Sequence, residues 1–440
     1  MNKVSLEDIV SLAKRRGFIY PSSEIYGGMA GVYDYGPLGT RLKRNIIDIW
    51  LKFFVDGWDD MYQVDAGILM NKKVWEASGH ASGFNDPMVE CSNCHSRLRV
   101  DHVEKGACPV CGAAHTLSAP REFNMMFKTQ VGAVEGDDNI SYLRPETAQG
   151  IFVNFKNVLD SFYPDMPFGI AQIGKGFRNE ISPREFLFRL RELEMMEIEY
   201  FVEPAKWEES FEKWRKDTHA FFKKLGLPAD KIHELEVPEK DRAHYSKRTI
   251  DFEFDFPFGK RELSGLAYRT DYDLKHHAEA SGKSLEYKPK NPPAGGAGKS
   301  FIPHVIEPSF GIDRLVLAIL SSAYCEDSPP AGGGEKRIFM KFAPEVAPVK
   351  VAVCPLAKNK PELVKKAQEI YKQIKKYVNG EVMWIDTGNI GKNYRRADEI
   401  GVPKFITVDF DTLTDDSVTL RDRDTTKQER VKVDELPGKL

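Results

Sequence analysis

The 440-residue sequence lacks the long hydrophobic run that a membrane span needs. Its longest apolar stretch near a predicted helix covers 315–320, whereas a span takes about 20 apolar residues. The first residues include Glu7 and Asp8 and show no basic segment followed by an apolar one, so no secretion signal is predicted. These absences predict a soluble, cytoplasmic protein that does not bind membranes.

A strong excess of one charge is also missing, because 63 Lys and Arg stand against 66 Asp and Glu, a net charge of −3. The apolar share of 41% and the charged share of 29% exclude a disordered or fibrous chain. Residues 337–440 are slightly basic, with 20 Lys and Arg against 16 Asp and Glu. This part is compatible with RNA binding and, equally, with an ordinary solvated surface.

Cysteine is scarce, at six residues, but four of the six form two CxxC pairs separated by 13 residues. Cys91, Cys94, Cys108 and Cys111 are predicted to hold one structural Zn²⁺ in a ribbon, since four thiolates complete a tetrahedral site. Reduced free thiols or a redox pair are the alternatives. Cys325 and Cys354 are expected to be core residues.

Proline and glycine indicate how the chain is divided. The segment 328–334, SPPAGGG, is the best linker candidate, and the strands and helices that alternate after it predict a small α/β domain with a parallel or mixed sheet. Residues 121–200 look strand-like with few breaks. Residues 204–245 are charged and look helical, and 88–118 are a compositional island around the paired cysteines.

An arginine-rich hairpin follows the apolar strand predicted at 168–173. Arg178, Arg184, Arg189 and Arg191 lie close together in the sequence, and guanidinium groups offer paired donors to phosphate oxygens. A solvated basic hairpin is the alternative interpretation.

The returning strand at 188–202 has two different faces. Since side chains alternate along a strand, Glu197 is predicted to point away from the mostly apolar face formed by Glu194, Met196, Ile198, Tyr200 and Val202. A carboxylate placed among Leu193 and Met195 is either part of a structural salt bridge or a ligand for a cation.

A third candidate is the segment 307–314, which predicts a strand, a turn and then a buried helix. Arg314 comes at the start of that helix, and Gly311 removes side-chain bulk just before it. A helix start with an arginine is a plausible triphosphate site.

These pieces resemble the signature motifs of class II aminoacyl-tRNA synthetases. The segments GFIYPSSEIYGG, YDYGPLG, LRPETAQGIFVNF, FRNEISPREF, EIEYF, RTDYDL, EPSFGIDR and GKNYRRADEIG together resemble the homodimeric glycyl-tRNA synthetase family over nearly the whole chain. The resemblance implies an α+β fold. A catalytic domain at 1–334, with an antiparallel sheet flanked by helices, would carry insertions at 88–118 (zinc ribbon) and 204–245 (helical), and an α/β anticodon-binding domain would follow at 335–440.

The resemblance also implies an ATP site and its residues. Arg178, Glu180 and Arg314 would be catalytic, with Arg178 on the α-phosphate and Arg314 against adenine and the terminal phosphates, and Mg²⁺ would neutralise phosphate charge. The ATP-binding residues would be Arg178, Asn179, Glu180, Phe188, Arg189, Leu190, Arg191, Glu192, Leu193, Glu262, Leu263, Gly311, Ile312, Asp313 and Arg314. Leu193 departs from the family, which usually has an aromatic residue there that stacks on adenine.

A glycine pocket is implied in the same way. It would be formed by Glu146, Glu197, Glu307 and Ser309, with Arg99 and the neighbouring Leu193, Glu194, Met195, Met196 and Pro308. Glycine offers only an ammonium, a carboxylate and its small size, so carboxylates would attract the ammonium while a filled pocket excludes a methyl group.

The remaining implications concern partners. The implied reaction makes glycyl-adenylate from glycine and ATP and transfers glycyl to the 3′ end of tRNA(Gly), and residues 36–66 would build a homodimer interface. Arg395 and Arg396 are candidates for RNA contact, although a salt bridge to Asp398 or Glu399 is an equal alternative. A catalytically silent accessory subunit and a synthetase for another small amino acid are the rival functions.

Overall fold

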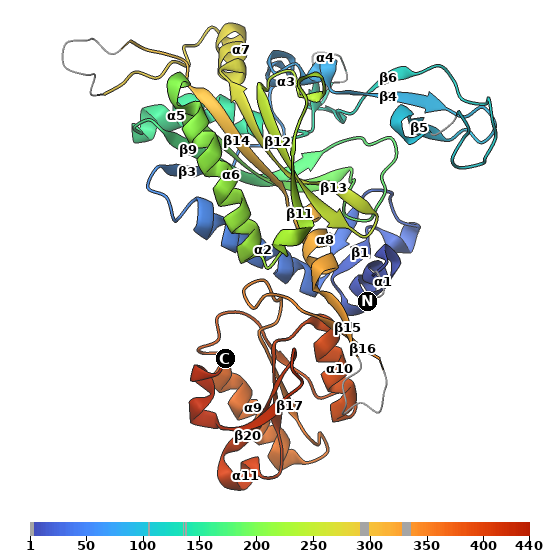
Figure 1. Cartoon of the computed structure of the whole chain (residues 1–440), viewed down its shortest axis with the longest axis vertical. Coiled ribbons are helices and arrows are strands. Elements are labelled where there is room, and N and C mark those ends of the chain that lie inside the picture. Colours follow the sequence, from blue (N-terminus) through green and yellow to red (C-terminus); the bar gives the residue numbers. More distant parts are fainter. Residues whose placement is uncertain (1–3, 104–105, 135, 137–138, 291–298, 328–335) are drawn as a thin grey trace.

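The computed structural model describes residues 4–103, 106–134, 136, 139–290, 299–327 and 336–440. Its largest feature is a seven-stranded sheet in the N-terminal lobe (Figure 1). The strands lie in the order β11 (Ile232–Glu236), β12 (Arg248–Phe256), β13 (Gly259–Thr270), β14 (His304–Gly311), β10 (Glu192–Val202), β9 (Phe168–Phe177) and β3 (Met61–Val64). All neighbours are antiparallel except β9 and β3, so the expected antiparallel sheet is confirmed.

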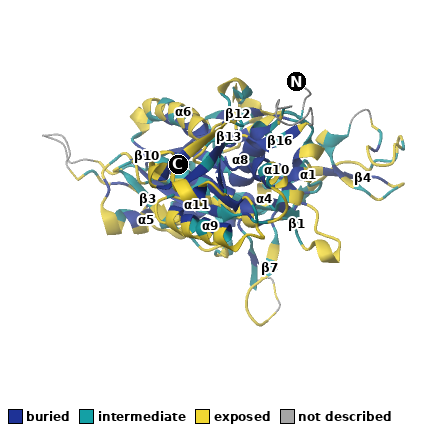
Figure 2. Cartoon of the chain, turned by 90° about the horizontal axis from the view of Figure 1, so that it is seen from below, coloured by how far each residue is buried: buried dark blue, intermediate teal, exposed yellow. Residues whose placement is uncertain are grey.

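Three helices build the main core against one face of this sheet. They are α2 (Pro37–Phe54), α6 (Trp207–Lys224) and α8 (Ile312–Ala323). Helix α8 is apolar on nearly every side, and all of 315–320 is buried, as expected for a helix that other elements surround. Trp50 of α2 and Trp214 of α6 are fully buried in this core, which forms the dark interior of Figure 2.

The opposite face is covered by α5 (Ala148–Phe162) and by α7 (Tyr272–Ser281), which packs against α5. The strand-like interpretation of 121–200 is wrong for α5. Ala148, Ile151, Phe152 and Phe155 recur at three- and four-residue spacing and are all buried, which is the pattern of one helix face. The segment is rich in apolar residues, and this composition hid the helical period.

The charged segment 204–245 contains the expected helix, α6, but also more. It begins with η4 (Pro204–Lys206), continues after α6 through η5 (Ala229–Lys231), and then forms β11, the edge strand of the large sheet. A short η6 (Glu239–Asp241) leads on toward β12. The segment is thus integrated into the central sheet as well as into the core.

The chain opens with α1 (Leu6–Arg16), whose start is fixed by a capping box between Ser5 and Asp8. The strands β1 (Ile19–Pro21) and β2 (Tyr33–Tyr35) and the turn η1 (Glu24–Tyr26) follow. Helix α1 packs against both α8 and α10 (Ile390–Ile400). Arg15 and Arg16 pair with Glu399 of α10, which ties the opening helix to the C-terminal lobe.

The cysteine segment forms an arm beside the sheet. Its strands β4 (Asn85–Glu90), β5 (Arg97–Arg99) and β6 (Arg121–Asn124) pair in the order β5-β4-β6. The short helices α3 (Lys72–Ala77) and α4 (His80–Gly83) precede it, and η2 (Val100–His102) follows β5. A hairpin of β7 (Lys128–Gln130) and β8 (Ile140–Tyr142) then leads toward α5.

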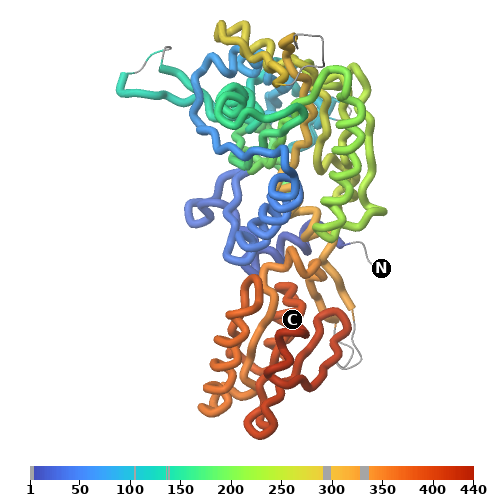
Figure 3. Tube along the Cα trace, turned by 90° about the vertical axis from the view of Figure 1, so that its left-hand side faces the viewer, coloured from blue at the N-terminus to red at the C-terminus, as the bar shows by residue number. Residues whose placement is uncertain are grey.

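The C-terminal lobe, coloured orange to red in Figure 3, has its own five-stranded sheet and its own cluster of buried apolar residues. In it β17 (Val351–Pro355), β18 (Val382–Trp384) and β19 (Lys404–Val408) are parallel, while β20 (Ser417–Asp422) and β21 (Gln428–Lys432) are antiparallel. Helices α9 (Pro361–Ile374), α10 and α11 (Thr412–Asp415) and η8 (Val433–Gly438) complete it. The predicted α/β domain with a mixed sheet is confirmed.

Strands β15 (Tyr324–Asp327) and β16 (Arg337–Met340) form a hairpin between the lobes, and the predicted linker 328–334 lies outside the described residues. Among the helices in the described ranges, none combines the length and apolar character that crossing a bilayer requires.

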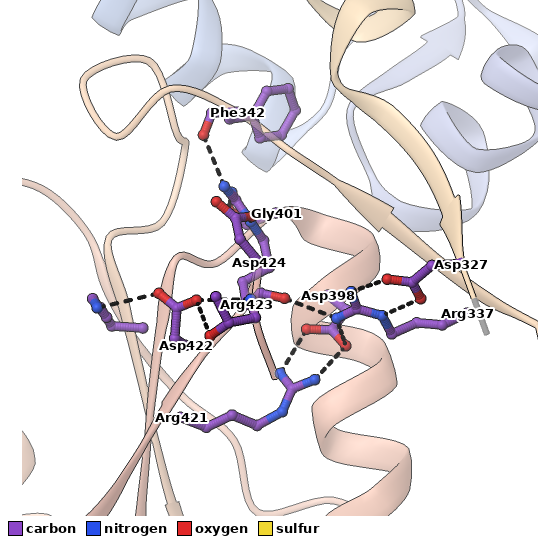
Figure 4. A network of polar contacts seen from close by, with 11 residues as sticks. Asp327, Arg337, Phe342, Asp398, Gly401, Arg421, Asp422, Arg423 and Asp424 are labelled. Carbon is purple, nitrogen blue, oxygen red and sulfur yellow. Dashed lines mark hydrogen bonds and ion pairs between the residues drawn. The ribbon is translucent and has the colours of Figure 1, made fainter. Parts of the chain in front are cut away.

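An ionic network around the buried Asp398 fixes the C-terminal lobe to this hairpin (Figure 4). Asp398 of α10 accepts hydrogen bonds from Arg421 at 2.7 and 2.9 Å and from Arg337 at 3.2 Å. Arg337 also pairs with Asp327, at 2.6 Å. Arg423 pairs with Asp424 and donates to the carbonyls of Gly401 and Phe342. These three arginines and three aspartates balance in charge.

Candidate active site

Three glutamates converge on the face of the sheet that carries α5. Glu197 comes from β10, Glu307 from β14, and Glu146 from the loop before α5. The side chains are buried, with 2%, 6% and 7% of the residue exposed respectively. Ser309 pairs with Glu197 across the two strands, so the predicted set of Glu146, Glu197, Glu307 and Ser309 lies together.

Glu197 is held by donors on two sides. The backbone N–H of Thr147 donates to its Oε2 at 2.7 Å, and the Thr147 hydroxyl donates to the same oxygen. Ser309 Oγ donates to Oε1 at 3.2 Å. The carboxylate is therefore fixed at the start of α5, where the N–H groups of the first turn favour negative charge.

The other two glutamates are positioned by residues that sequence reasoning did not select. His80 Nε2 lies 3.3 Å from Glu146 Oε2, and Gln149 donates to Glu146 at 3.1 Å. Arg269, fully buried, donates to Glu307 at 2.8 Å and grips Asp273 with two bonds of 2.8 Å. The only signal for Arg269 and Asp273 was the segment RTDYDL.

The electrostatics of this pocket favour a cation. Burial, and then the charge of Glu146, raises the pKa of Glu197, and burial raises the pKa of Glu307 to about 8 despite Arg269. Burial also acts to raise the pKa of Glu146, but His80, Arg269 and Gln149 outweigh it, so this pKa is lowered. Carboxylates outnumber the positive groups, and a bound ammonium would relieve their mutual repulsion.

The structure separates the neighbours of Glu197 as strand alternation predicts. Leu193 and Met195 share its face, whereas Glu194 and Met196 lie on the far side of the sheet. Glu194 pairs there with Lys43 at 2.6 Å, and Met196 is buried in the main core. Glu194 and Met196 are therefore not brought to the pocket, and neither is Pro308, which alternates with Glu307 and Ser309 along β14.

The arginine-rich hairpin lies next to the pocket. Arg178 donates to the carbonyl of Pro145, beside Glu146, at 3.1 Å, and its guanidinium lies 5.5 Å from the ring centre of Phe84. Arg314 and, to a smaller extent, Arg178 lower the pKa of Glu262 on β13, and the charge of Arg178 also opposes the rise in the pKa of Glu197, so Arg178 acts on both carboxylates. Glu180 is buried and pairs with Arg189 at 3.4 Å, and its backbone carbonyl accepts from Arg191.

Arg314 occupies the position expected at the start of α8. Its guanidinium lies 4.5 Å from the ring centre of Phe188 and pairs with Glu262 at 2.9 Å. A flat cation on an aromatic ring, next to the basic hairpin, forms a surface suited to a purine and phosphates. Of the other expected ATP residues, Leu263 and Ile312 are buried in the main core. The Asp313 carboxylate accepts hydrogen bonds from the Tyr35 hydroxyl and from the backbone N–H of Glu194.

Comparison with known proteins agrees with this geometry. Residues 127–323 match the tRNA synthetase class II core domain (G, H, P, S and T), and 350–440 match the anticodon binding domain. Glycine–tRNA ligases of Cutibacterium acnes and Clostridium acetobutylicum are 45% and 46% identical, over 99% and 98% of this chain and 96% and 97% of theirs. The chain belongs to the glycine–tRNA ligase family.

One more glycine–tRNA ligase and one solved structure of another synthetase also resemble this chain. The glycine–tRNA ligase of Thermus thermophilus is 44% identical over 99% of this chain and 98% of its own. A solved structure, Giardia lamblia prolyl-tRNA synthetase in complex with prolyl-adenylate, superposes with a TM-score of 0.70 at 16% identity, covering 98% of this chain and 76% of that chain. The latter shows the shared fold alone.

The four paired cysteines of this family member form a cluster that fits zinc. All four sulfurs lie within 4.8 Å of one another, with Sγ–Sγ distances of 3.8 Å for Cys91 and Cys111 and 3.7 Å for Cys94 and Cys108. Zn–S bonds of about 2.3 Å in a tetrahedron require edges of about 3.8 Å. In the described ranges this is the one such group of His, Cys, Asp and Glu side chains.

Arg99 lies in the same arm and points to acidic partners there. It pairs with Asp86 and with Asp101, and the charge of Glu180 acts on it. It therefore faces the hairpin side of the site, and in the part of the chain that the structure describes it forms no hydrogen bond or ion pair with the three pocket glutamates.

The two arginines expected to meet RNA lie on α10 and are exposed. Arg396 donates to Thr387 at 3.3 Å. Asp398 is engaged by Arg337 and Arg421, and Glu399 by Arg15 and Arg16. A salt bridge from Arg396 to Asp398 or Glu399, the alternative to RNA contact, would therefore compete with arginines that already pair with these two carboxylates.

Proposed function

We propose that this protein is a glycine–tRNA ligase, which activates glycine with ATP and transfers the glycyl group to the 3′ end of tRNA(Gly). The observation that carries the proposal is the buried cluster of Glu146, Glu197 and Glu307 beside an arginine-rich hairpin. Three carboxylates suit an ammonium ion, and their enclosed position suits the smallest amino acid.

Each part of the site has a role in the first step. The three glutamates, with Ser309, would bind the ammonium of glycine, and its carboxylate would attack the α-phosphate of ATP in line, with pyrophosphate leaving. Arg178 acts electrostatically on both Glu197 and Glu262, which supports its placement at the α-phosphate. The chemistry needs no covalent nucleophile, because positioning and charge neutralisation lower the barrier.

Adenine would lie between Arg314 and the residues of the returning strand. Phe188 is already in contact with the Arg314 guanidinium, and Leu193 would add apolar contact without stacking. Glu262 is the carboxylate we propose as an oxygen ligand for Mg²⁺, which would supply further positive charge to the phosphates. Zinc would be structural, since four thiolates leave no open position.

The remaining assignments complete the proposal. We assign residues 1–334 to catalysis and 335–440 to anticodon binding, with Arg395 and Arg396 in contact with RNA. We further propose that residues 36–66 form a homodimer interface and that the protein is cytoplasmic.

Amino-acid-dependent exchange of pyrophosphate into ATP tests the proposal and both rivals. Exchange with glycine, but not with alanine, serine, threonine or proline, is the expected result. No exchange would indicate an accessory subunit, and exchange with another amino acid but not glycine would indicate a different synthetase. Charging of tRNA(Gly) transcript then tests the second step.

A further inference from the structure

One carboxyl group beside the pocket is unexplained by the proposed reaction. Glu199 of β10 is fully buried, with none of its surface exposed. Neither of its two carboxyl oxygens has a hydrogen-bond partner in the described part of the chain. Buried polar atoms are nearly always paired, so this exception requires a reason.

Strand register places Glu199 next to a pocket residue. In the antiparallel pair of β10 and β14, Glu197 lies opposite Ser309 and Tyr200 opposite Ile306, so the register places Glu199 opposite Glu307. Directly opposed residues of antiparallel strands point to the same face, about 5 Å apart. On the other side, β9 presents Ile170, which is apolar and buried.

The charges that face Glu199 do not neutralise it. They are Glu307 from β14, Arg269 from β13, Asp273 from α7 and Glu197 from β10. Arg269 is the sole cation among them, and its donors already bond to Glu307 and Asp273. Burial, followed by the charge of Glu307, raises the pKa of Glu199 well above its ordinary value.

We propose that Glu199 carries a proton in the empty pocket and releases it when the glycine ammonium enters, so that glycine capture is coupled to proton release. This inference rests on the proposed glycine pocket. The O–H bond of the carboxylic acid breaks, the proton passes to solvent buffer, and the carboxylate left behind is offset by the positive charge of the ammonium. Glu199 is then a positioning residue that acts through Glu307.

The coupling can be measured by calorimetric titration of the full chain with glycyl sulfamoyl adenosine, a non-hydrolysable analogue of glycyl-adenylate. Titrations at one pH in phosphate and in Tris, which differ in ionisation enthalpy, give the number of protons released. Near neutral pH the wild-type protein is expected to release at least one proton per analogue, because Glu307, whose pKa is raised to about 8, can release a proton as well as Glu199. The same analogue with its amino group replaced by hydrogen is expected to release none.

Two substitutions assign the proton. Glu199→Gln, which is close in shape but has no acidic proton, is expected to reduce the release by at least half. The matched control, Glu203→Gln, alters a partly exposed glutamate that lies just beyond the same strand and pairs with Lys206. This variant should release as many protons as wild type. If Glu199→Gln does not fold, as judged by circular dichroism, Glu199→Met replaces it.

The outcomes separate the two proposals. If the analogue does not bind the wild-type protein, the glycine pocket itself is wrong. If it binds but the wild type releases no proton, or Glu199→Gln releases as many as wild type, the role of Glu199 is overturned. As a second readout, the KM for glycine in pyrophosphate exchange should fall with rising pH in the wild type and change less in Glu199→Gln.

Discussion

Two clusters of charge, one in each half of the molecule, differ in the balance of their positive and negative groups. At the hairpin between the lobes, three arginines meet three aspartates, and Asp398 is bound by Arg337 and Arg421 (Figure 4). In the pocket of the large sheet, the buried carboxylates of Glu146, Glu197, Glu307 and Asp273 outnumber Arg269, the one arginine in the described part of the chain that bonds to any of them. The balanced cluster needs no further charge, whereas the glycine ammonium that we propose to bind in the pocket would offset the surplus negative charge there. We therefore expect the two clusters to respond differently to substitution.

The largest effect expected from this difference is on activity. Glu197→Gln should lower kcat/KM for glycine about 1,000-fold, equivalent to about 4 kcal/mol, because it removes charge from the ammonium site. Its thermal stability should be equal to or above that of wild type, since like charges are relieved. Pyrophosphate exchange measures the activity with glycine, and thermal unfolding measures the stability. A variant that loses stability along with activity would show that Glu197 is structural.

The balanced cluster should respond in the opposite way. Asp398→Asn removes the shared partner of two buried arginines and should cost about 3 kcal/mol of unfolding free energy. Glycine activation by the folded fraction should change less than threefold, because the pocket is untouched. Chemical denaturation and exchange assays at low temperature test this, and an unchanged midpoint would mean that the network does not stabilise the lobe.

The cysteine cluster extends the comparison, because four thiolates around a zinc ion would be a second group of like charge that a cation completes. Protein purified without added zinc should contain about one zinc per chain. Cys108→Ser should lower this content and lower the Tm of the arm, whereas Cys354→Ser, which changes a buried cysteine elsewhere, should leave the zinc content unchanged. Elemental analysis measures the metal, and absence of zinc from the wild-type protein would contradict the site.

The stability of the folded protein should decrease as pH rises, because the carboxyl groups of the unbalanced pocket hold protons in the folded state. The pKa of Glu307 is raised to about 8 in the folded chain, against about 4.3 in an unfolded one. The contribution of Glu307 to the free energy of unfolding is therefore fully present below about pH 4.3 and is lost as the pH rises through 8. The Tm should drop between pH 6 and 8.5, and Glu307→Gln should flatten that slope. An equal slope in both proteins would assign the titration to another group.

The smallest expected effect concerns the nucleotide. Leu193→Phe restores the aromatic side chain usual in the family and should lower KM for ATP about three- to fivefold, equivalent to about 1 kcal/mol of stacking. KM for glycine should stay within twofold. A KM for ATP that rises would indicate that the half-buried position has no space for a ring.

The site was predicted from the sequence where it depends on local pattern, and missed where it depends on distant contacts. Strand alternation placed Glu197 away from the core, and CxxC spacing brought the four cysteines together. Gln149 and Asp273 are bonded across 124 positions of the chain, and nothing local to either indicates the other. His80 and Arg269 were missed for the same reason, and α5 was missed because its apolar residues dominate its composition.

The pairing of Arg15 and Arg16 with Glu399 has a mechanical consequence. The opening helix α1 is ion-paired with α10, which carries Arg395 and Arg396. It also packs against α8, whose first turn carries Arg314. Because α1 contacts both lobes, a displacement of α10 relative to the large sheet would disturb the ion pairs of α1 with Glu399 or its contacts with α8, so this eleven-residue helix couples the positions of the two lobes.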